Sequence, residues 1–531
     1  MTLGLGIAPV AAMADPGNGN GNDPAVAVIV EPGTSGFATA SALVNSVLPP
    51  GQAKQVNLDI INGVAVTLPQ HFVNLLTSAG GQVLPDEPVS VQDAASSSGP
   101  ATCPGPTGPS TPSGNFTKDT GADQLAAAGD NGSGATVAVI DTGINSSLPD
   151  FGNRVVGGVD LSGGNSPFTD QYGHGTFVAG LIAGDGTASN GAYPGEAPGA
   201  NLVSVKAAGA TGVTSASTIV KAIQWVTQNR NKYKITGLNL SFGAVPLGPT
   251  SMEPMDQAVE KAWKAGITVV VSAGNAGPFN GTITSPGDDP YVITVGAYDD
   301  NNSSAPYDWA DCSFSSVGPT AYDGFIKPDI SAPGRSVISV LDPGSTIALA
   351  NPGAVVGTGN FVGSGTSFSA AITSGAAALV QADNPGASPN EIKGRLLGNA
   401  LPGQLGNPFV EGHGYLNAFY AATGPKLVLN QANGNSGQGQ GNLFQNPTVS
   451  LGSSWNGSSW NGSSWNGSSW NGMVWDGSSW NGSSWNGSSW NGSSWNGSSW
   501  NGSSWNGSSW NGSSWNGSSW NGSSWNGSSW N

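Results

Sequence analysis

The chain has 531 residues, a formal net charge of −17 and only 15 lysines and arginines. This length is sufficient for two or three domains. So few basic residues exclude a patch for nucleic acid and disfavour binding to an anionic membrane surface. After the N-terminus no apolar stretch reaches the length of a transmembrane helix, so we expect no membrane span.

Residues 1–14, MTLGLGIAPVAAMA, are apolar and end in Ala-Met-Ala, a pattern typical of the end of a secretion signal. The stretch lacks the basic residues with which such signals usually begin. We therefore expect a secreted protein, and a merely apolar N-terminus stays open as the alternative.

A small α/β unit is predicted for residues 25–92. An Asn-Gly pair between two apolar runs indicates a hairpin within 55–69. The order strand, helix, strand, strand, helix, strand is typical of a ferredoxin-like domain. We expect the strands at 25–30, within 55–69 and at 82–92, and the helices at 37–48 and 71–80. Residues 93–114, rich in Ser, Pro and Gly, predict an exposed and cleavable linker.

Strands and helices alternate in residues 115–421, which predicts a parallel β-sheet flanked by helices on both faces. Ligands of such sheets bind at the carboxyl ends of the strands. Asp141 and Asn275 each end an apolar run and are expected at that edge. The predicted strands are 136–141, 201–207, 235–242, 267–274 and 291–297, and two of the helices are 215–228 and 252–266.

Three motifs of this region carry an acid, a base and a hydroxyl. Asp141 lies in VAVIDTGI, His174 in GHGTFVAG and Ser367 in GSGTSFSA. A serine hydroxyl is a weak nucleophile that needs a base to take its proton and an acid to orient that base. The order Asp, His, Ser therefore predicts a serine hydrolase with a catalytic triad.

The same motifs resemble those of the subtilisin-like serine endopeptidases. The agreement covers DTGI, GHGT and GTSFS around the triad, together with LSFG at 240–243 and SAGN at 272–275. The resemblance implies the subtilisin-like fold for residues 115–421 and an inhibitory propeptide at 15–92. It also implies a self-processing zymogen, cleaved in the linker, that hydrolyses protein or peptide substrates.

The resemblance assigns roles to single residues. His174 would accept the proton of Ser367, and Asp141 would orient the imidazole. Asn275 would donate a hydrogen bond to the oxyanion. Ser241 and Gly243 would bind the substrate by main-chain pairing. The pattern implies no catalytic cofactor and leaves the preferred substrate side chain open.

Two further features leave alternatives open. Cys103 and Cys312 form either one disulfide or two free thiols. The pairs 288–289 and 299–300 are acidic and are candidates for structural calcium. Their spacing is not diagnostic, and a solvated acidic loop is the plainer interpretation.

A repeat of Gly-Ser-Ser-Trp-Asn fills residues 453–531, after a second linker at 422–452. A period of five fits a β-solenoid with twenty residues per coil, although tryptophan would crowd its interior, or a flexible chain with aromatic groups for stacking on sugars. The alternative function is therefore a surface-binding protein whose tail contacts glycan or cell wall. An acyl transferase using the same triad also stays open.

Overall fold

The computed structural model describes residues 23–48, 53–91, 103, 114–426, 454–471, 474–506, 509–526 and 529–530, with side chains up to residue 426. The predicted signal at 1–14 and most of the linkers at 93–114 and 422–452 lie outside these residues. The chain divides into two compact units, Met1–Asp86 and Glu87–Asn531. In the described part of the chain, no helix is both long and apolar enough to span a membrane.

The smaller unit has the predicted order of elements. Its four-stranded antiparallel sheet has the strand order β2-β3-β1-β4, which is that of a ferredoxin-like domain. The side chain of Thr39 caps the first helix by accepting a hydrogen bond from the amide of Ala42. The elements are β1 Ala25–Glu31, α1 Ala40–Val47, β2 Val56–Leu58, β3 Gly63–Pro69, α2 Gln70–Ser78 and β4 Gln82–Pro85.

Two details of residues 25–92 differ from the sequence prediction. The hairpin turn is longer than an Asn-Gly pair, because a short 3-10 helix at Asp59–Ile61 precedes Asn62, which has a φ of 56°. The single strand predicted over 82–92 is divided into two strands, β4 and β5 (Pro88–Val91), and these belong to different sheets. The alternation of apolar residues fits both strands, so it could not reveal the break.

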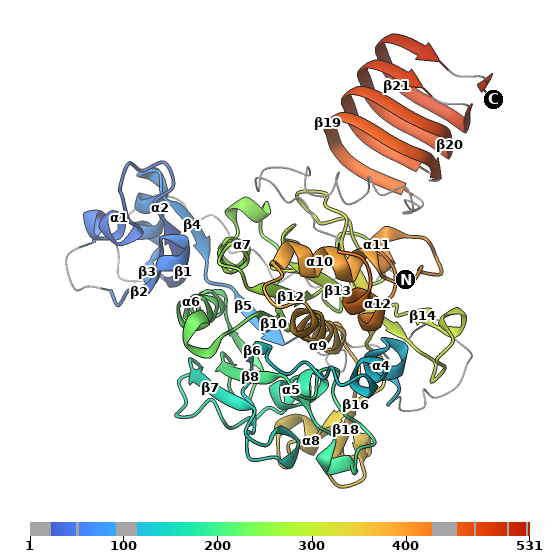
Figure 1. The fold of residues 1–531 in the computed structure, drawn as a ribbon. Coiled ribbons are helices and arrows are strands. Elements are labelled where there is room, and N and C mark those ends of the chain that lie inside the picture. Colours follow the sequence, from blue (N-terminus) through green and yellow to red (C-terminus); the bar gives the residue numbers. More distant parts are fainter. Residues whose placement is uncertain are drawn as a thin grey trace, which may run out of the picture. The chain divides into compact units, whose positions relative to one another are not determined.

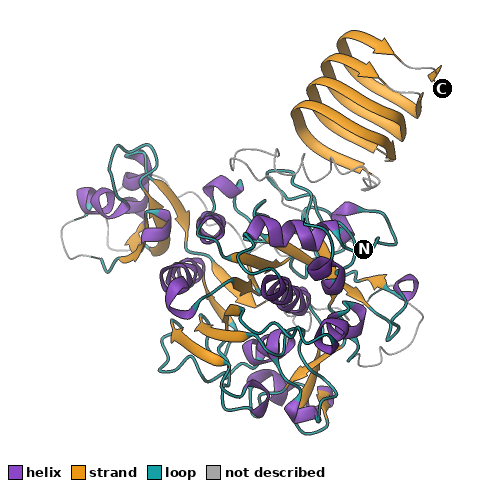
Figure 2. Ribbon diagram, viewed as in Figure 1, coloured by secondary structure: helices purple, strands orange, loops and turns teal. Residues whose placement is uncertain are grey.

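The larger unit contains an eight-stranded, mostly parallel sheet with helices on both faces, as predicted (Figures 1 and 2). Its strand order is β14-β13-β12-β10-β6-β8-β7, with β15 paired to β13. The strands are β6 Thr136–Asp141, β7 Val155–Asp160, β8 Asn201–Lys206, β10 Gly237–Leu240, β12 Thr268–Ser272, β13 Ile293–Asp299, β14 Ala310–Asp311 and β15 Ile330–Pro333.

Two pairs of helices cover this sheet. Helices α5 and α9 contact each other, as do α6 and α7, and α9 runs against the central strands. Each helix buries an apolar face, so the core lies between sheet and helices. The main helices are α5 His174–Ala183, α6 Ala216–Tyr233, α7 Pro254–Lys264, α9 Thr366–Asp383, α10 Pro389–Gly398 and α12 Ala418–Thr423.

Smaller elements complete the unit. A three-stranded sheet joins β5 to β9 (Val213–Ser215) and β11 (Phe242–Gly243), and a second joins β16 (Val337–Val340), β17 (Val355–Val356) and β18 (Asn360–Gly363). Cys103 and Cys312 form a disulfide, which settles the alternative that the sequence left open. The short helices are α3 Phe116–Asp119, α4 Ala122–Ala127, α8 Thr346–Ala350 and α11 Pro408–Glu411.

The repeat region forms parallel strands in a stack of its own (Figure 1). Ser454 pairs with Val474 and Ser489 with Ser509, so each strand is offset from the next by twenty residues. This register is that of the twenty-residue coil considered from the sequence, with each tryptophan position opposite another. The strands are β19 Ser454–Asn471, β20 Val474–Asn506, β21 Ser509–Asn526 and β22 Ser529–Trp530.

Candidate active site

Asp141 and His174 meet at the carboxyl end of the central sheet. Asp141 is the last residue of β6 and His174 the first of α5, and both are completely buried. The Nδ1 atom of His174 lies 2.8 Å from Oδ1 of Asp141. A side chain at Gly175 could not fit, because its Cβ would lie 2.2 Å from the carbonyl oxygen of Gly143. This glycine therefore permits the close approach of helix and strand.

Asp170 holds the turn that leads into α5, and the sequence analysis missed it. Its carboxylate accepts hydrogen bonds from the amides of Gly173 and Thr176 and from the hydroxyl of Thr142, each at 2.8 Å. Thr142 in turn accepts from the amide of Gly175 at 2.9 Å. Burial raises the pKa of Asp170, while these hydrogen bonds act to lower it. The sequence did contain a signal for this role, namely an acidic residue just before the histidine motif.

Ser367 is the second residue of α9, at the N-terminal end predicted for it. Its Oγ donates to the carbonyl oxygen of Ser241 at 3.4 Å, and the Oγ of Ser241 donates to the carbonyl of Ser367 at 3.2 Å. The ring of the next residue, Phe368, lies 5.5 Å from the ring of His174. The structure therefore brings the three predicted residues of the triad to one place.

Asn275 is fixed by the residue before the nucleophile. Its Oδ1 accepts hydrogen bonds from the amide and the hydroxyl of Thr366, both at 3.0 Å. Its Nδ2 is buried and has no hydrogen-bond partner within the described residues. A donor held in place beside Ser367, without a partner, is what an oxyanion hole requires. The anchoring role of Thr366 was not foreseen from the sequence.

The strand at 88–91 lies beside the predicted substrate-binding residues. In the small sheet β5 is the central strand, antiparallel to both β9 and β11. Ser90 pairs with Gly243 and Val91 with Phe242. Gly243 therefore takes part in main-chain pairing with an extended segment, here one from the same chain. Ser241 lies just before β11 and contacts Ser367.

The acidic pairs suggested for calcium are buried, so their interpretation as a solvated loop was wrong. Burial raises the pKa of Asp288 to about 7 and that of Asp289 to about 8. Asp299 pairs with Arg335, whose NH1 lies 2.7 Å from Oδ2 of Asp299. Within the described residues, no group of three or more His, Cys, Asp or Glu side chains is arranged to hold a metal.

The profile of the subtilase family (Peptidase S8) matches residues 132–441, more than half of the chain. The chain belongs to the subtilase family. This subtilase is 40% identical over 292 residues to Serine protease AprX from Bacillus subtilis, an alignment that covers 54% of the chain and 66% of AprX. It is 36% identical over 304 residues to Subtilisin DY from Bacillus licheniformis, covering 57% of the chain and 95% of the relative.

A solved structure agrees with the fold of this subtilase. Fervidolysin from Fervidobacterium pennivorans, described as a keratinolytic enzyme related to subtilisin, aligns with a TM-score of 0.58 and 21% identity. The alignment covers 77% of this chain and 62% of fervidolysin, and at that identity it supports the fold alone. Membership of the family makes the domain at 132–441 a serine-type endopeptidase domain, which needs no catalytic cofactor.

Proposed function

We propose that the whole chain is a secreted serine endopeptidase, made as a zymogen that processes itself. The observation that carries the peptidase activity is the buried hydrogen bond between Asp141 and His174, beside Ser367 at the start of α9. Among the residues that the structure describes, no lysine or arginine pairs with Asp141, so its carboxylate is available to stabilise a protonated imidazole.

In the proposed reaction Ser367 is the nucleophile and His174 the base. The Oγ of Ser367 attacks the carbonyl carbon of the substrate while its proton passes to Nε2 of His174. Asp141 accepts the hydrogen bond from Nδ1–H and stabilises the imidazolium. His174 then gives the proton to the leaving amine. Water next attacks the acyl-enzyme and passes its proton to His174, which returns that proton to the Oγ of Ser367 as the acid product leaves.

Asn275 is the proposed oxyanion donor. As the carbonyl carbon becomes tetrahedral, its oxygen gains negative charge, and the Nδ2 of Asn275 and the amide of Ser367 would donate to it. Because Thr366 already fixes the Oδ1 of Asn275, little reorganisation is needed at the moment of reaction. The N-terminus of α9 favours the same negative charge.

The position of strand β5 supports the proposal that the chain is made as a zymogen. It pairs with β11 in the direction that leads toward Ser241, and Ser241 contacts Ser367. We therefore place the processing cut directly after this strand, at the start of the predicted linker. Until that cut, β5 would occupy the position of a substrate and block the site, as an intramolecular inhibitor does.

The test is expression of residues 15–531 beside the Ser367→Ala variant, with mass spectrometry of the products. Cleavage near residue 92 in the parent, and intact protein in the variant, is the expected result. Intact protein in both, without labelling by a covalent serine-directed probe, would contradict the proposal. A cut that also occurs in the variant would show that another protease makes it.

The repeat region supports a second, separate function. Its parallel register places the tryptophan positions of neighbouring coils opposite each other, with Trp455 opposite Trp475 and Trp490 opposite Trp510. Regularly spaced aromatic positions suit the repeating sugars of a glycan. We infer that the tail retains the enzyme on a glycan or cell wall, which a deletion described below would test.

A further inference from the structure

Residues 284–292, called here the wall segment, join the two parts of the candidate site. Ser285 and Ala244 exchange backbone hydrogen bonds at 3.0 and 3.1 Å, and Ala244 directly follows the substrate-pairing strand β11. At the same end of the segment, the amide of Thr284 donates to the carbonyl of Ala273 at 3.1 Å, two residues before Asn275. A shift of this segment would therefore reach both the substrate strand and the oxyanion residue.

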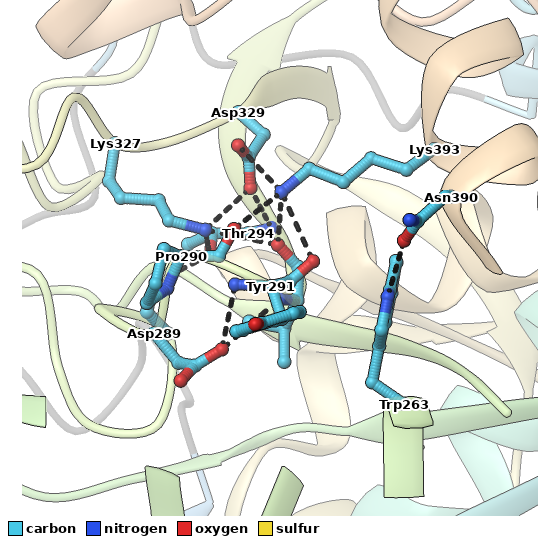
Figure 3. A network of polar contacts seen from close by, with 11 residues as sticks. Trp263, Asp289, Pro290, Tyr291, Thr294, Lys327, Asp329, Asn390 and Lys393 are labelled. Carbon is cyan, nitrogen blue, oxygen red and sulfur yellow. Dashed lines mark hydrogen bonds and ion pairs between the residues drawn. The ribbon is translucent and has the colours of Figure 1, made fainter. Parts of the chain in front are cut away.

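The other end of the wall segment surrounds one ammonium group. The Nζ of Lys393, from α10, donates to the carbonyl oxygens of Pro290, Tyr291 and Val292 at 3.0, 3.2 and 2.8 Å (Figure 3). The lysine side chain is completely buried. Three consecutive carbonyl dipoles that converge on one point repel each other, and the ammonium group of Lys393 offsets that repulsion.

A second lysine holds the same region from the other side. The Nζ of Lys327 lies 3.0 Å from the carbonyl oxygen of Val292 and 2.8 Å from the hydroxyl of Thr294. Asp329 lies between the two ammonium groups, with contacts of 2.7 Å to Lys327 and 3.2 Å to Lys393. Two buried cations share one anion, so the carbonyls of the wall segment supply the remaining compensation.

Contacts also run from this cluster toward the site. The hydroxyl of Thr294, which accepts from Lys327, itself donates to the carbonyl of Gly287. Gly287 packs against β12, since a Cβ there would lie 2.8 Å from the carbonyl oxygen of Ser272. The carboxylate of Asp289 closes the turn by accepting from the amide of Tyr291 at 2.8 Å.

We propose that Lys393 and Lys327 are positioning residues for substrate binding, which fix the wall segment between the substrate strand and Asn275. This inference rests on the proposed peptidase function. The lysines touch no reacting atom. They set the shape of the surface against which the substrate lies, so their loss weakens substrate binding more than it slows the chemical step.

The pH dependence separates this role from a merely stabilising one. Burial lowers the pKa of Lys393 to about 8, while the charge of Asp329 acts to raise it and that of Lys327 to lower it. Asp289 also faces this cluster, and His413 beside it has a pKa lowered to about 4 by burial, so it is neutral. Above pH 8 Lys393 loses its charge and keeps only two N–H groups for the three carbonyl oxygens. The wall segment is then held less firmly, so KM should rise.

Stability moves in the opposite direction. Because the pKa of Lys393 is lower in the folded than in the unfolded protein, the folded state binds fewer protons between about pH 8 and 10.5. The contribution of this group to the free energy of unfolding therefore increases with pH in that window. A rise in KM there cannot be attributed to Lys393 destabilising the fold.

The experiment compares Lys393→Met and Lys327→Met with Arg395→Met in the mature enzyme obtained from the full chain. Arg395 lies on the opposite face of α10, two residues on, and pairs with Glu391 at 3.2 Å. Active sites are counted with a covalent serine-directed probe, and kcat and KM are measured with a chromogenic peptide. We expect both lysine variants to raise KM about tenfold with kcat changed less than about threefold, the pattern of lost uniform binding.

Two results would overturn the inference. The first is an equal KM for Lys393→Met and Arg395→Met when both have the same melting temperature. The second is a KM of the parent that stays constant from pH 7 to 9.5, and this measurement decides even where the lysine variants do not fold. Because burial also raises the pKa of Asp288 to about 7 and that of Asp289 to about 8, a variant with both Asp288→Asn and Asp289→Asn that keeps the rise in KM assigns it to Lys393. A parent that neither takes up the probe nor cleaves peptide would instead refute the peptidase function.

Discussion

The domain at 115–426 and the repeat region at 454–530 specify structure in opposite ways. In the domain each functional side chain is held by specific, non-repeating partners: Asp141 holds His174, Thr366 holds Asn275, and Asp329 lies between Lys327 and Lys393. In the repeat region nearly the same five residues recur, and each strand pairs with a near-copy of itself at a fixed offset of twenty residues. Single substitutions should therefore be severe in the domain and slight in the repeat.

The largest effect is expected from Ser367→Ala. It removes the nucleophile, so kcat should fall by about 10⁶-fold, the size known for the corresponding change in a subtilisin. Peptide hydrolysis by probe-titrated parent and by an equal mass of folded variant measures this. A variant that keeps a hundredth of the parent activity would show that Ser367 is not the nucleophile.

Asn275→Ala should reduce kcat by about 10²–10³-fold with little change in KM, again the size known for a subtilisin. The reason is that the donor acts on the oxyanion, which exists only after attack. Thr366→Val should give a smaller loss in the same direction, because Asn275 would keep its donor and the hydrogen bond from the backbone amide of residue 366, and would lose only the one from the hydroxyl. A change in KM alone in Asn275→Ala would contradict the assignment to an oxyanion hole.

Removal of the disulfide by Cys103→Ser together with Cys312→Ser should lower the free energy of unfolding by about 2–5 kcal/mol. The two cysteines are 209 residues apart, so the bond restricts a long loop of the unfolded chain. Thermal unfolding in the inactive Ser367→Ala background avoids self-digestion. An unchanged melting temperature would show that the bond contributes nothing to the stability of the fold.

Asp119→Asn is expected to stabilise the protein at pH 8. Burial, followed by the neighbouring carboxylate of Asp300, raises the pKa of Asp119 to about 9. The folded state therefore holds an extra proton between about pH 4 and 9, and the free energy of unfolding falls as the pH rises through that window. Melting temperatures at pH 5 and pH 8 should differ less in the variant. An equal difference would exclude this carboxyl as the cause.

The smallest effect on catalysis is expected from deletion of residues 450–531. The catalytic residues and their partners all precede residue 450, so kcat/KM for a short peptide should stay the same. Retention on isolated cell walls should fall, because the regular aromatic positions would be lost. Unchanged retention would refute the glycan-binding role. A large loss of peptide hydrolysis would show that catalysis depends on the repeat region as well as on the domain.

The order of elements and the triad could be predicted because their signals are local. The apolar runs located β6, β8, β10, β12 and β13 to within a few residues, and the motif glycines mark close approaches such as that at Gly175. The separation of β4 from β5 could not be predicted, since it depends on which sheet each strand meets. The burial of Asp288 and Lys393 was hidden for the same reason: charged residues are normally exposed, and only tertiary packing provides their partners.

The disulfide between Cys103 and Cys312 has a further consequence for how maturation would appear on a gel. The proposed processing cut precedes Cys103, so it would release residues 1–92 under any conditions. A cut between residues 104 and 113 would leave the N-terminal fragment, which contains Cys103, attached to the enzyme through the disulfide. Such a two-chain form would migrate as one band without a reductant and as two bands with it.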